Sequence, residues 1–186
     1  MKRIVFIQNL IAPYRSHFFN ILYSKDSRFK VYYMGKTEKD RNWKIEDIKI
    51  SHDFWLDRWG IYFTLLGFHI HINPILVLKV LCSKSVGEII LGGSWCDLNV
   101  LALVLAKRLR LTKKRYHIWA EANYLTSGAR NDNRLKQSLR CFVYGAVDGF
   151  FIVPGKMALI TFEKWRNQKY YKPELFFPTN LVMKGD

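Results

Sequence analysis

The sequence predicts a single α/β domain built on a doubly wound parallel sheet. Short apolar runs rich in β-branched and aromatic residues alternate along the chain with longer segments of helical periodicity. These runs are almost continuously hydrophobic, which is typical of parallel strands that helices cover on both faces. The chain has 186 residues, 49% of them hydrophobic and 24% charged, so it can bury one large core.

Each expected strand is marked by its own apolar run. The strands are expected at residues 3–8, 29–34, 48–56, 86–92, 115–121 and 148–153. Helices are expected where apolar residues recur at helical spacing, as Tyr14, Phe18 and Leu22 do. Further helices are expected at 74–83, along a leucine-rich stripe from 98 to 109, at 132–145 and at 155–166.

Several classes of protein are disfavoured by what the sequence lacks. Cys82, Cys96 and Cys141 are odd in number and have no CxxC spacing, so neither a disulfide framework nor a zinc site is expected. The GxGxxG and GxxxxGK[ST] patterns are absent, which disfavours dinucleotide and P-loop enzymes, and no cofactor or metal is expected. The first apolar run stops at Gln8, which is too short for a signal peptide, so we expect a cytoplasmic protein.

Ligands of doubly wound sheets bind at the carboxyl ends of the strands, where loops meet helix N-termini. The candidate binding residues therefore lie in the loops after the first, fourth, fifth and sixth expected strands. They are Asn9, Tyr14, Arg15, Gly92, Gly93, Ser94, Trp95, Asn123, Arg130, Gly155 and Lys156. The glycine pair would let the backbone approach a ligand closely, although a plain tight turn before a helix would also use it.

Two carboxylates near these loops are expected to have different roles. Glu121 ends the fifth expected strand, where an acid is unfavourable without a partner or a cavity. It is the candidate catalytic residue, as a general base for a hydroxyl, with an ion pair to Arg130 or Arg134 as the structural alternative. Asp97 follows Ser94 by three residues, so a capping box between them would make Asp97 structural.

The charge of the chain is strongly positive. Thirty Lys and Arg against 15 Asp and Glu give a formal net charge of +15, which favours an anionic partner. The densest basic cluster, at 107–115, lies at the edge opposite the expected crevice, and the helix dipole explains only part of it. Because aromatic residues do not interleave with these cations, an anionic membrane surface is expected rather than nucleic acid.

A second segment also points to a membrane surface. Between Arg58 and Lys79 no Lys, Arg, Asp or Glu occurs, but two histidines and Pro74 interrupt the run, so no spanning helix is expected. We expect an interfacial anchor there, with a core-packing insertion as the alternative. The expected membrane-facing residues are Trp55, Trp59, Tyr62, Phe63, Lys107, Arg108, Arg110, Lys113, Lys114 and Arg115.

Three stretches of the chain are similar to parts of one known family. They are Gln8-Asn9 through Pro13-Tyr14-Arg15 to Leu22, Trp119-Ala120-Glu121 through Arg130 to Pro154-Gly155, and Pro178-Thr179-Asn180. Together they resemble the N-terminal domain of glycosyltransferase family 4 enzymes, which have the GT-B fold. The resemblance implies that residues 1–186 form one Rossmann-like, acceptor-binding domain. It also implies that a C-terminal domain absent from this chain binds the nucleotide sugar.

The chain departs from the family at two points. The family's donor motif, Glu-x7-Glu, is matched only by the spacing of Glu38 and Glu46, which lie in a charged stretch before the third expected strand. Many relatives have histidine where Glu121 falls, which leaves the catalytic assignment open.

The expected function is sugar transfer from a nucleotide sugar to a lipid-linked or surface-polysaccharide acceptor, at the inner face of the cell membrane. This chain alone is expected to be inactive, because the donor half is missing from it. The alternative is a non-catalytic basic α/β protein that binds either a membrane or nucleic acid.

Overall fold

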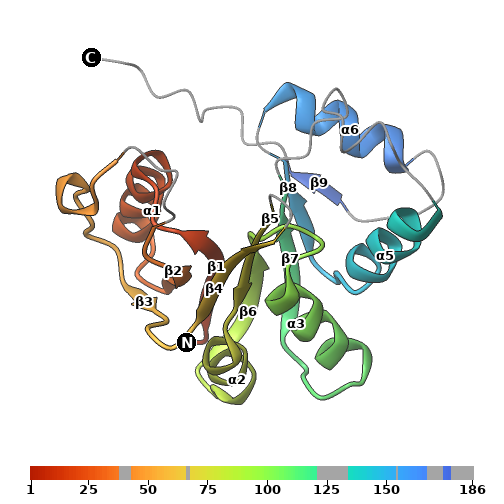
Figure 1. Ribbon diagram of the computed structural model, residues 1–186, viewed down its shortest axis with the longest axis horizontal. Coiled ribbons are helices and arrows are strands. Elements are labelled where there is room, and N and C mark those ends of the chain that lie inside the picture. The colour runs from red at the N-terminus through yellow and green to blue at the C-terminus, as the bar shows by residue number, and fades with distance from the viewer. Residues whose placement is uncertain (38–42, 66–67, 121–133, 154, 167–173, 177–186) are drawn as a thin grey trace.

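The computed structural model describes the chain except for residues 38–42, 66–67, 121–133, 154, 167–173 and 177–186 (Figure 1). Its centre is a seven-stranded sheet in the order β3-β2-β1-β6-β7-β8-β9. All neighbouring strands in this sheet are parallel. The strands are β1 (Arg3–Leu10), β2 (Phe29–Gly35), β3 (Phe54–Leu56), β6 (Val86–Leu91), β7 (Arg115–Trp119), β8 (Phe150–Ile152) and β9 (Glu174–Phe176). The predicted α/β class with a doubly wound, Rossmann-like parallel sheet is confirmed.

Helices cover both faces of this sheet. One face packs against α1 (Pro13–Lys25), whose Phe19 shares a buried cluster with Phe6 and Tyr33. The other face packs against α2 (Pro74–Cys82), α3 (Leu98–Arg108), α5 (Arg134–Tyr144) and α6 (Lys156–Arg166). The strand order reverses beside β1, which pairs with β2 on one side and with β6 on the other. The gap between β1 and β6 is therefore the topological switch point of the fold.

Alternate residues of β1 belong to two separate hydrophobic cores. Val5 and Ile7 of β1 face the core shared by α2, α3, α5 and α6. Phe6, between them, faces α1, and its ring lies 4.9 Å from that of Phe19. Both sides of the strand are therefore buried, which explains the continuous hydrophobicity of the strand sequences.

The expected third strand is shorter than predicted. Strand pairing with β2 is confined to Phe54–Leu56, and residues Ile45–Asp47 form a short 3-10 turn, η1. The side chain of Asn20 explains the difference, because it takes hydrogen bonds that a neighbouring strand would otherwise take. Its Nδ2 donates to the Lys49 carbonyl (2.8 Å), and its Oδ1 accepts the Ser51 N–H (2.8 Å).

The uncharged segment before α2 forms a β-hairpin that the sequence analysis did not predict. Its strands, β4 (Ile61–Leu65) and β5 (Phe68–Ile72), are antiparallel and form a separate two-stranded sheet. Strand β9 was not predicted either. Within the described residues, none of the helices is long and apolar enough to cross a membrane.

Candidate functional site

A cavity of about 290 Å³ opens at the switch point. The residues that line it lie at the carboxyl ends of two strands, in the loops after two strands, or on two helices. They are Asn9, Arg15, Gly92, Gly93, Ser94, Trp95, Ile118, Trp119, Ala120 and Tyr144. We call this cavity the switch-point crevice. It brings together the predicted residues Asn9, Arg15, Gly92, Gly93, Ser94 and Trp95, which come from the end of β1, from α1 and from the loop after β6.

Gly92 is required because β1 passes very close to it. The Gly92 N–H donates to the Ile7 carbonyl at 2.8 Å. A Cβ on residue 92 would lie 2.6 Å from that oxygen and 2.1 Å from Gln8 Nε2. The glycine therefore allows the ends of β1 and β6 to pack closely. Because it has no side chain, its backbone lines the crevice.

Asn9 of the β1 end lines the crevice, and the buried Gln8 lies next to it in the chain. Arg15 Nη1, from α1, donates a hydrogen bond to Oε1 of the fully buried Gln8. Within the described residues, Gln8 Nε2 and Asn9 Oδ1 are buried without a hydrogen-bond partner. Unpaired buried amides are unfavourable, so a ligand or water that forms hydrogen bonds with them would stabilise this end of β1.

An aromatic ring, Trp95, lines the crevice, and a guanidinium group that does not line it lies beside this ring. Trp95 is half-buried, and the guanidinium carbon of Arg140 lies 5.7 Å from its ring centroid. Arg140 is itself buried in α5, one turn before Tyr144. Burial raises the pKa of the Tyr144 hydroxyl above its ordinary value, so Tyr144 stays neutral at physiological pH.

Sequence reasoning did not single out Arg140, Tyr144 or Trp119 as site residues. A signal for Arg140 was present in the sequence, since it shares the buried face of α5 with Val143 and Tyr144. A cation on the apolar face of an amphipathic helix needs a partner or a cavity.

The structure does not bring every predicted residue to the crevice. Tyr14 is exposed beside the Arg15 guanidinium, whose carbon lies 5.6 Å from its ring centroid, and it does not line the cavity. Gly155, with φ of 88°, and the exposed Lys156 begin α6 and do not line it either. The predictions for Glu121, Asn123 and Arg130 fall outside the described residues.

Asp97 has the structural role that was predicted, by a different geometry. It is itself the N-cap of α3, and its Oδ1 accepts the N–H groups of Asn99 (2.9 Å) and Val100 (3.1 Å). The predicted capping box with the Ser94 side chain is wrong, because the Ser94 hydroxyl lies beside Cys96 Sγ at 3.1 Å. Burial raises the pKa of Asp97, and the backbone hydrogen bonds oppose that shift.

Several cations predicted to face a membrane are instead bound within the fold. Lys107 Nζ pairs with Asp148 Oδ2 at 2.7 Å and also donates to the Lys114 carbonyl. Lys114 Nζ donates to the Leu81 carbonyl at 2.8 Å, and Arg108 Nη2 donates to that of Phe142 at 3.1 Å. Arg110, Lys113 and Arg115 are exposed.

Among the predicted membrane-facing aromatics, Trp55 is half-buried. It packs on Tyr32, and Lys79 Nζ lies 5.1 Å from its ring centroid. Trp55, Lys107 and Lys114 are therefore partly buried and make contacts within the fold.

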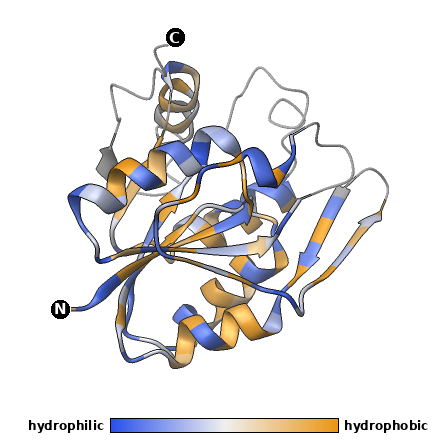
Figure 2. Ribbon diagram, turned by 90° about the vertical axis from the view of Figure 1, so that its left-hand side faces the viewer, coloured by the Kyte–Doolittle hydropathy of each residue, from blue (hydrophilic) through white to orange (hydrophobic). Residues whose placement is uncertain are grey.

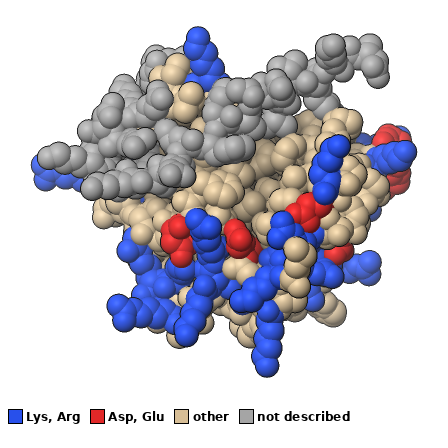
Figure 3. Space-filling view, turned by 180° about the vertical axis from the view of Figure 1, so that it is seen from behind, with Lys and Arg blue, Asp and Glu red and all other residues tan. Residues whose placement is uncertain are grey.

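The cations that remain exposed gather away from the crevice. Figure 3 shows Lys and Arg over the lower half of the rear face, the half in which Figure 1 places the N-terminus, α2 and α3. Arg3 and Arg115 begin β1 and β7, so this half includes the amino edge of the sheet. The crevice lies at the carboxyl edge.

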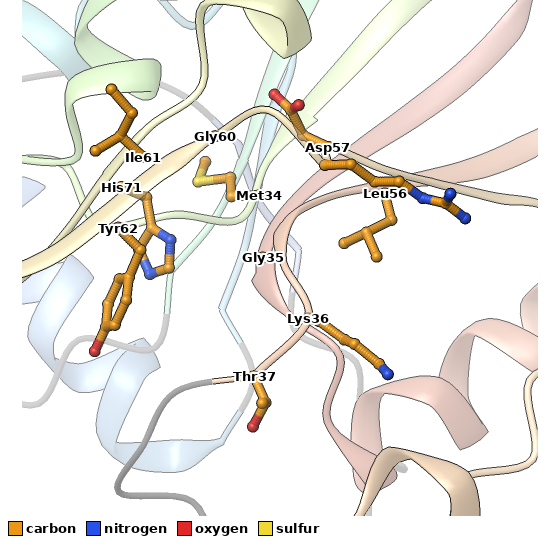
Figure 4. Close-up of a pocket in the computed structure, with 11 residues that line it drawn as sticks. Met34, Gly35, Lys36, Thr37, Leu56, Asp57, Gly60, Ile61, Tyr62 and His71 are labelled. Atoms are coloured by element: carbon orange, nitrogen blue, oxygen red, sulfur yellow. The ribbon is translucent and has the colours of Figure 1, made fainter.

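A second cavity, of about 510 Å³, lies between the ends of β2 and β3 and the hairpin (Figure 4). Its buried carboxylate, Asp57, accepts hydrogen bonds from Trp59 N–H (2.9 Å), Asn73 Nδ2 (3.2 Å) and Leu76 N–H (3.3 Å). Asp57 therefore holds the hairpin onto the start of α2. The buried His71 lines the same cavity and packs on Tyr62, with ring centroids 4.8 Å apart.

Among the described residues, no group of three or more His, Cys, Asp or Glu is placed to hold a metal ion. No protein-family model matches the chain, and no curated protein matches its sequence significantly. The similarity to family 4 glycosyltransferases therefore stays an expectation of the sequence.

Proposed function

We propose that the chain is the acceptor-binding half of a glycosyltransferase and that the switch-point crevice binds a phosphorylated sugar of the acceptor. One observation carries the proposal. Arg15, the half-buried Trp95 ring with Arg140 behind it, and a wall of glycine backbone meet in one crevice at the switch point. The doubly wound fold uses that position to bind ligands.

The chemistry of these groups suits a sugar that carries a phosphate. Guanidinium groups bind phosphate through paired N–H donors, and Arg15 lines this crevice, while the buried Arg140 beside Trp95 adds positive charge near it. An indole ring offers a flat apolar face on which the C–H face of a sugar ring can pack. The Asn9 amide and the Ser94 hydroxyl can exchange hydrogen bonds with sugar hydroxyls.

Transfer also requires a base and a donor. Ala120 lines the crevice, and Glu121 is the next residue in the chain, so Glu121 remains our proposed general base for the acceptor hydroxyl. The nucleotide sugar would be bound by a second domain, as the family resemblance implies. We further propose that the acceptor is lipid-linked and that the protein works at the inner face of the cell membrane.

Equilibrium binding tests the crevice directly. Isothermal titration with a panel of hexose 1-phosphates, and with the matching free hexoses, should show binding of at least one phosphate ester and much weaker binding of its parent sugar. Arg15→Gln should weaken phosphate-ester binding by about tenfold or more, because a charge-assisted contact is lost.

The matched control is Arg115→Gln, which removes an exposed guanidinium at the opposite edge of the sheet. This variant should bind like the parent chain. Equal losses in both variants would reduce the effect to net charge, and an unchanged affinity of Arg15→Gln would contradict the proposed site.

A further inference from the structure

The β4–β5 hairpin has one apolar face and one polar face. Antiparallel pairing places Ile61 opposite Ile72 and Phe63 opposite Ile70, and Leu65 lies on the same face as Ile61 and Phe63. The other face has Tyr62 opposite His71 and Thr64 opposite His69. Such two-faced ribbons normally turn the apolar side toward the protein core and the polar side toward water.

At its base this hairpin has the reverse orientation, whereas Thr64 and His69 of the polar face, nearer its tip, are exposed. The polar face turns inward at its base, where His71 is buried and Tyr62 lines the larger cavity (Figure 4). The apolar face turns outward, and Ile61, Phe63 and Leu65 are 61%, 40% and 54% exposed. Trp59, just before β4, is 76% exposed. An exposed apolar face of this kind marks a surface for an apolar partner.

The helix that follows the hairpin in the chain also exposes apolar side chains. Strand β5 ends at Ile72 and α2 begins at Pro74, and α2 exposes Ile75 and Leu78. Figure 2 shows the hairpin standing apart from the main sheet, at the right of the view, with strongly hydrophobic helix below the sheet. We call Trp59, Ile61, Phe63, Leu65, Ile75 and Leu78 the hairpin face.

The charges around this surface identify its partner. Residues 58–87 contain no Asp or Glu, and Arg58, Lys79 and Lys84 in that stretch are exposed. A second copy of the chain, with a net charge of +15, would bring more cations against these. An anionic bilayer accepts the apolar side chains and also attracts the cations around them.

We propose that the hairpin face inserts into the interface of an anionic lipid bilayer, with Trp59 at the level of the headgroups. The cations beside it contact lipid phosphates. The inference rests on the proposed membrane location and names the surface responsible, which differs from the crevice and from the cluster at 107–115. Hairpin residues line the larger cavity together with the ends of β2 and β3. Insertion of the hairpin would therefore hold this carboxyl edge of the sheet near the membrane.

Vesicle co-sedimentation of the 186-residue chain tests this surface. The parent should bind vesicles of phosphatidylcholine mixed with phosphatidylglycerol, bind phosphatidylcholine alone less well, and dissociate as salt rises. Combined Ile61→Ser, Phe63→Ser and Leu65→Ser should lower the partition coefficient by about tenfold or more, because three inserted apolar side chains are lost. The matched control, Ile21→Ser with Leu135→Ser, removes exposed apolar residues from α1 and α5 and should bind like the parent.

Two readouts separate this surface from the proposed crevice. The triple variant should keep the parent's circular dichroism spectrum and its affinity for hexose 1-phosphates, since its substitutions lie outside the crevice. Binding of the triple variant equal to the parent's would overturn the proposal, as would the absence of binding to either vesicle. A dimer seen by light scattering that the triple variant abolishes, without vesicle binding, would assign the face to a second copy and overturn it too.

Discussion

At the scale of single residues, the surroundings of His52 and His117 favour the neutral imidazole. His52 lies between Asn20 and Tyr33, with Nδ1 donating to Asn20 Oδ1 at 2.7 Å and the Tyr33 hydroxyl donating to Nε2 at 3.0 Å. Burial lowers the pKa of His52 to about 4. His117 is also buried, its Nε2 donates to Glu88 at 2.7 Å, and burial lowers its pKa despite that carboxylate.

These histidines make the stability of the fold depend on pH. In the unfolded chain a histidine binds a proton below about pH 6.5, whereas folded His52 stays neutral down to about pH 4. The unfolded state therefore binds more protons in this window, and stability falls as pH falls through it. His52 alone contributes on the order of 3 kcal/mol to this loss.

Urea unfolding between pH 4 and pH 7 measures the effect. His52→Gln should be less stable than the parent at neutral pH and should show a flatter dependence of unfolding free energy on pH. The exposed His17 provides the control, since His17→Gln should keep the parent's slope. A slope unchanged by His52→Gln would show that His52 is not the group responsible.

At the scale of elements, the hairpin is fixed to the domain by buried amides rather than by apolar packing of its outer face. Asn99 of α3 accepts the Asn73 N–H through Oδ1 at 2.7 Å and donates to the His71 carbonyl at 3.0 Å. Asn73 in turn donates to the Met34 carbonyl at the end of β2, at 2.8 Å. A fully paired buried network of this kind fixes one arrangement of its parts.

Asn99→Ala should therefore loosen the hairpin specifically. It removes the acceptor of the buried Asn73 N–H and a donor to the His71 carbonyl, which should lower the unfolding free energy by about 2 kcal/mol or more. Hydrogen exchange should accelerate at β5 amides while β1 stays protected. Asn20→Ala, the same substitution at the support of residues 49–52, should accelerate exchange there and leave β5 unchanged. Unaltered β5 exchange in Asn99→Ala would contradict this role.

The elements that sequence could predict are those with a strong period of their own. The apolar run at 29–34 predicts a strand, and the helical spacing of Tyr14, Phe18 and Leu22 predicts a helix, without any information on distant contacts. The expected strand at 48–56 is confined to Phe54–Leu56, because Asn20 of α1 binds the backbone of Lys49 and Ser51. The hairpin was missed because its apolar side faces outward, so its alternation was taken as part of one long uncharged segment.

At the scale of the whole molecule, three surfaces have different chemistry. The crevice lies at the carboxyl edge, exposed cations gather toward the amino edge, and the hairpin face adds an apolar flank. The topological rule for doubly wound sheets was sufficient to locate Asn9, Arg15 and Gly92 at the crevice. It could not locate Arg140, because its position depends on how α5 packs across Trp95.

The most direct test of the central claim, that the switch-point crevice is the ligand site, is chemical-shift mapping with a hexose 1-phosphate that binds. The amides of Gly92 and Gly93 and the side-chain amide of Asn9 should shift with one common affinity, since all three residues line the crevice. Gly35 and Gly60, which line the larger cavity beside the hairpin, should not move. Shifts at Gly35 and Gly60 with none at Gly92 and Gly93 would contradict the claim.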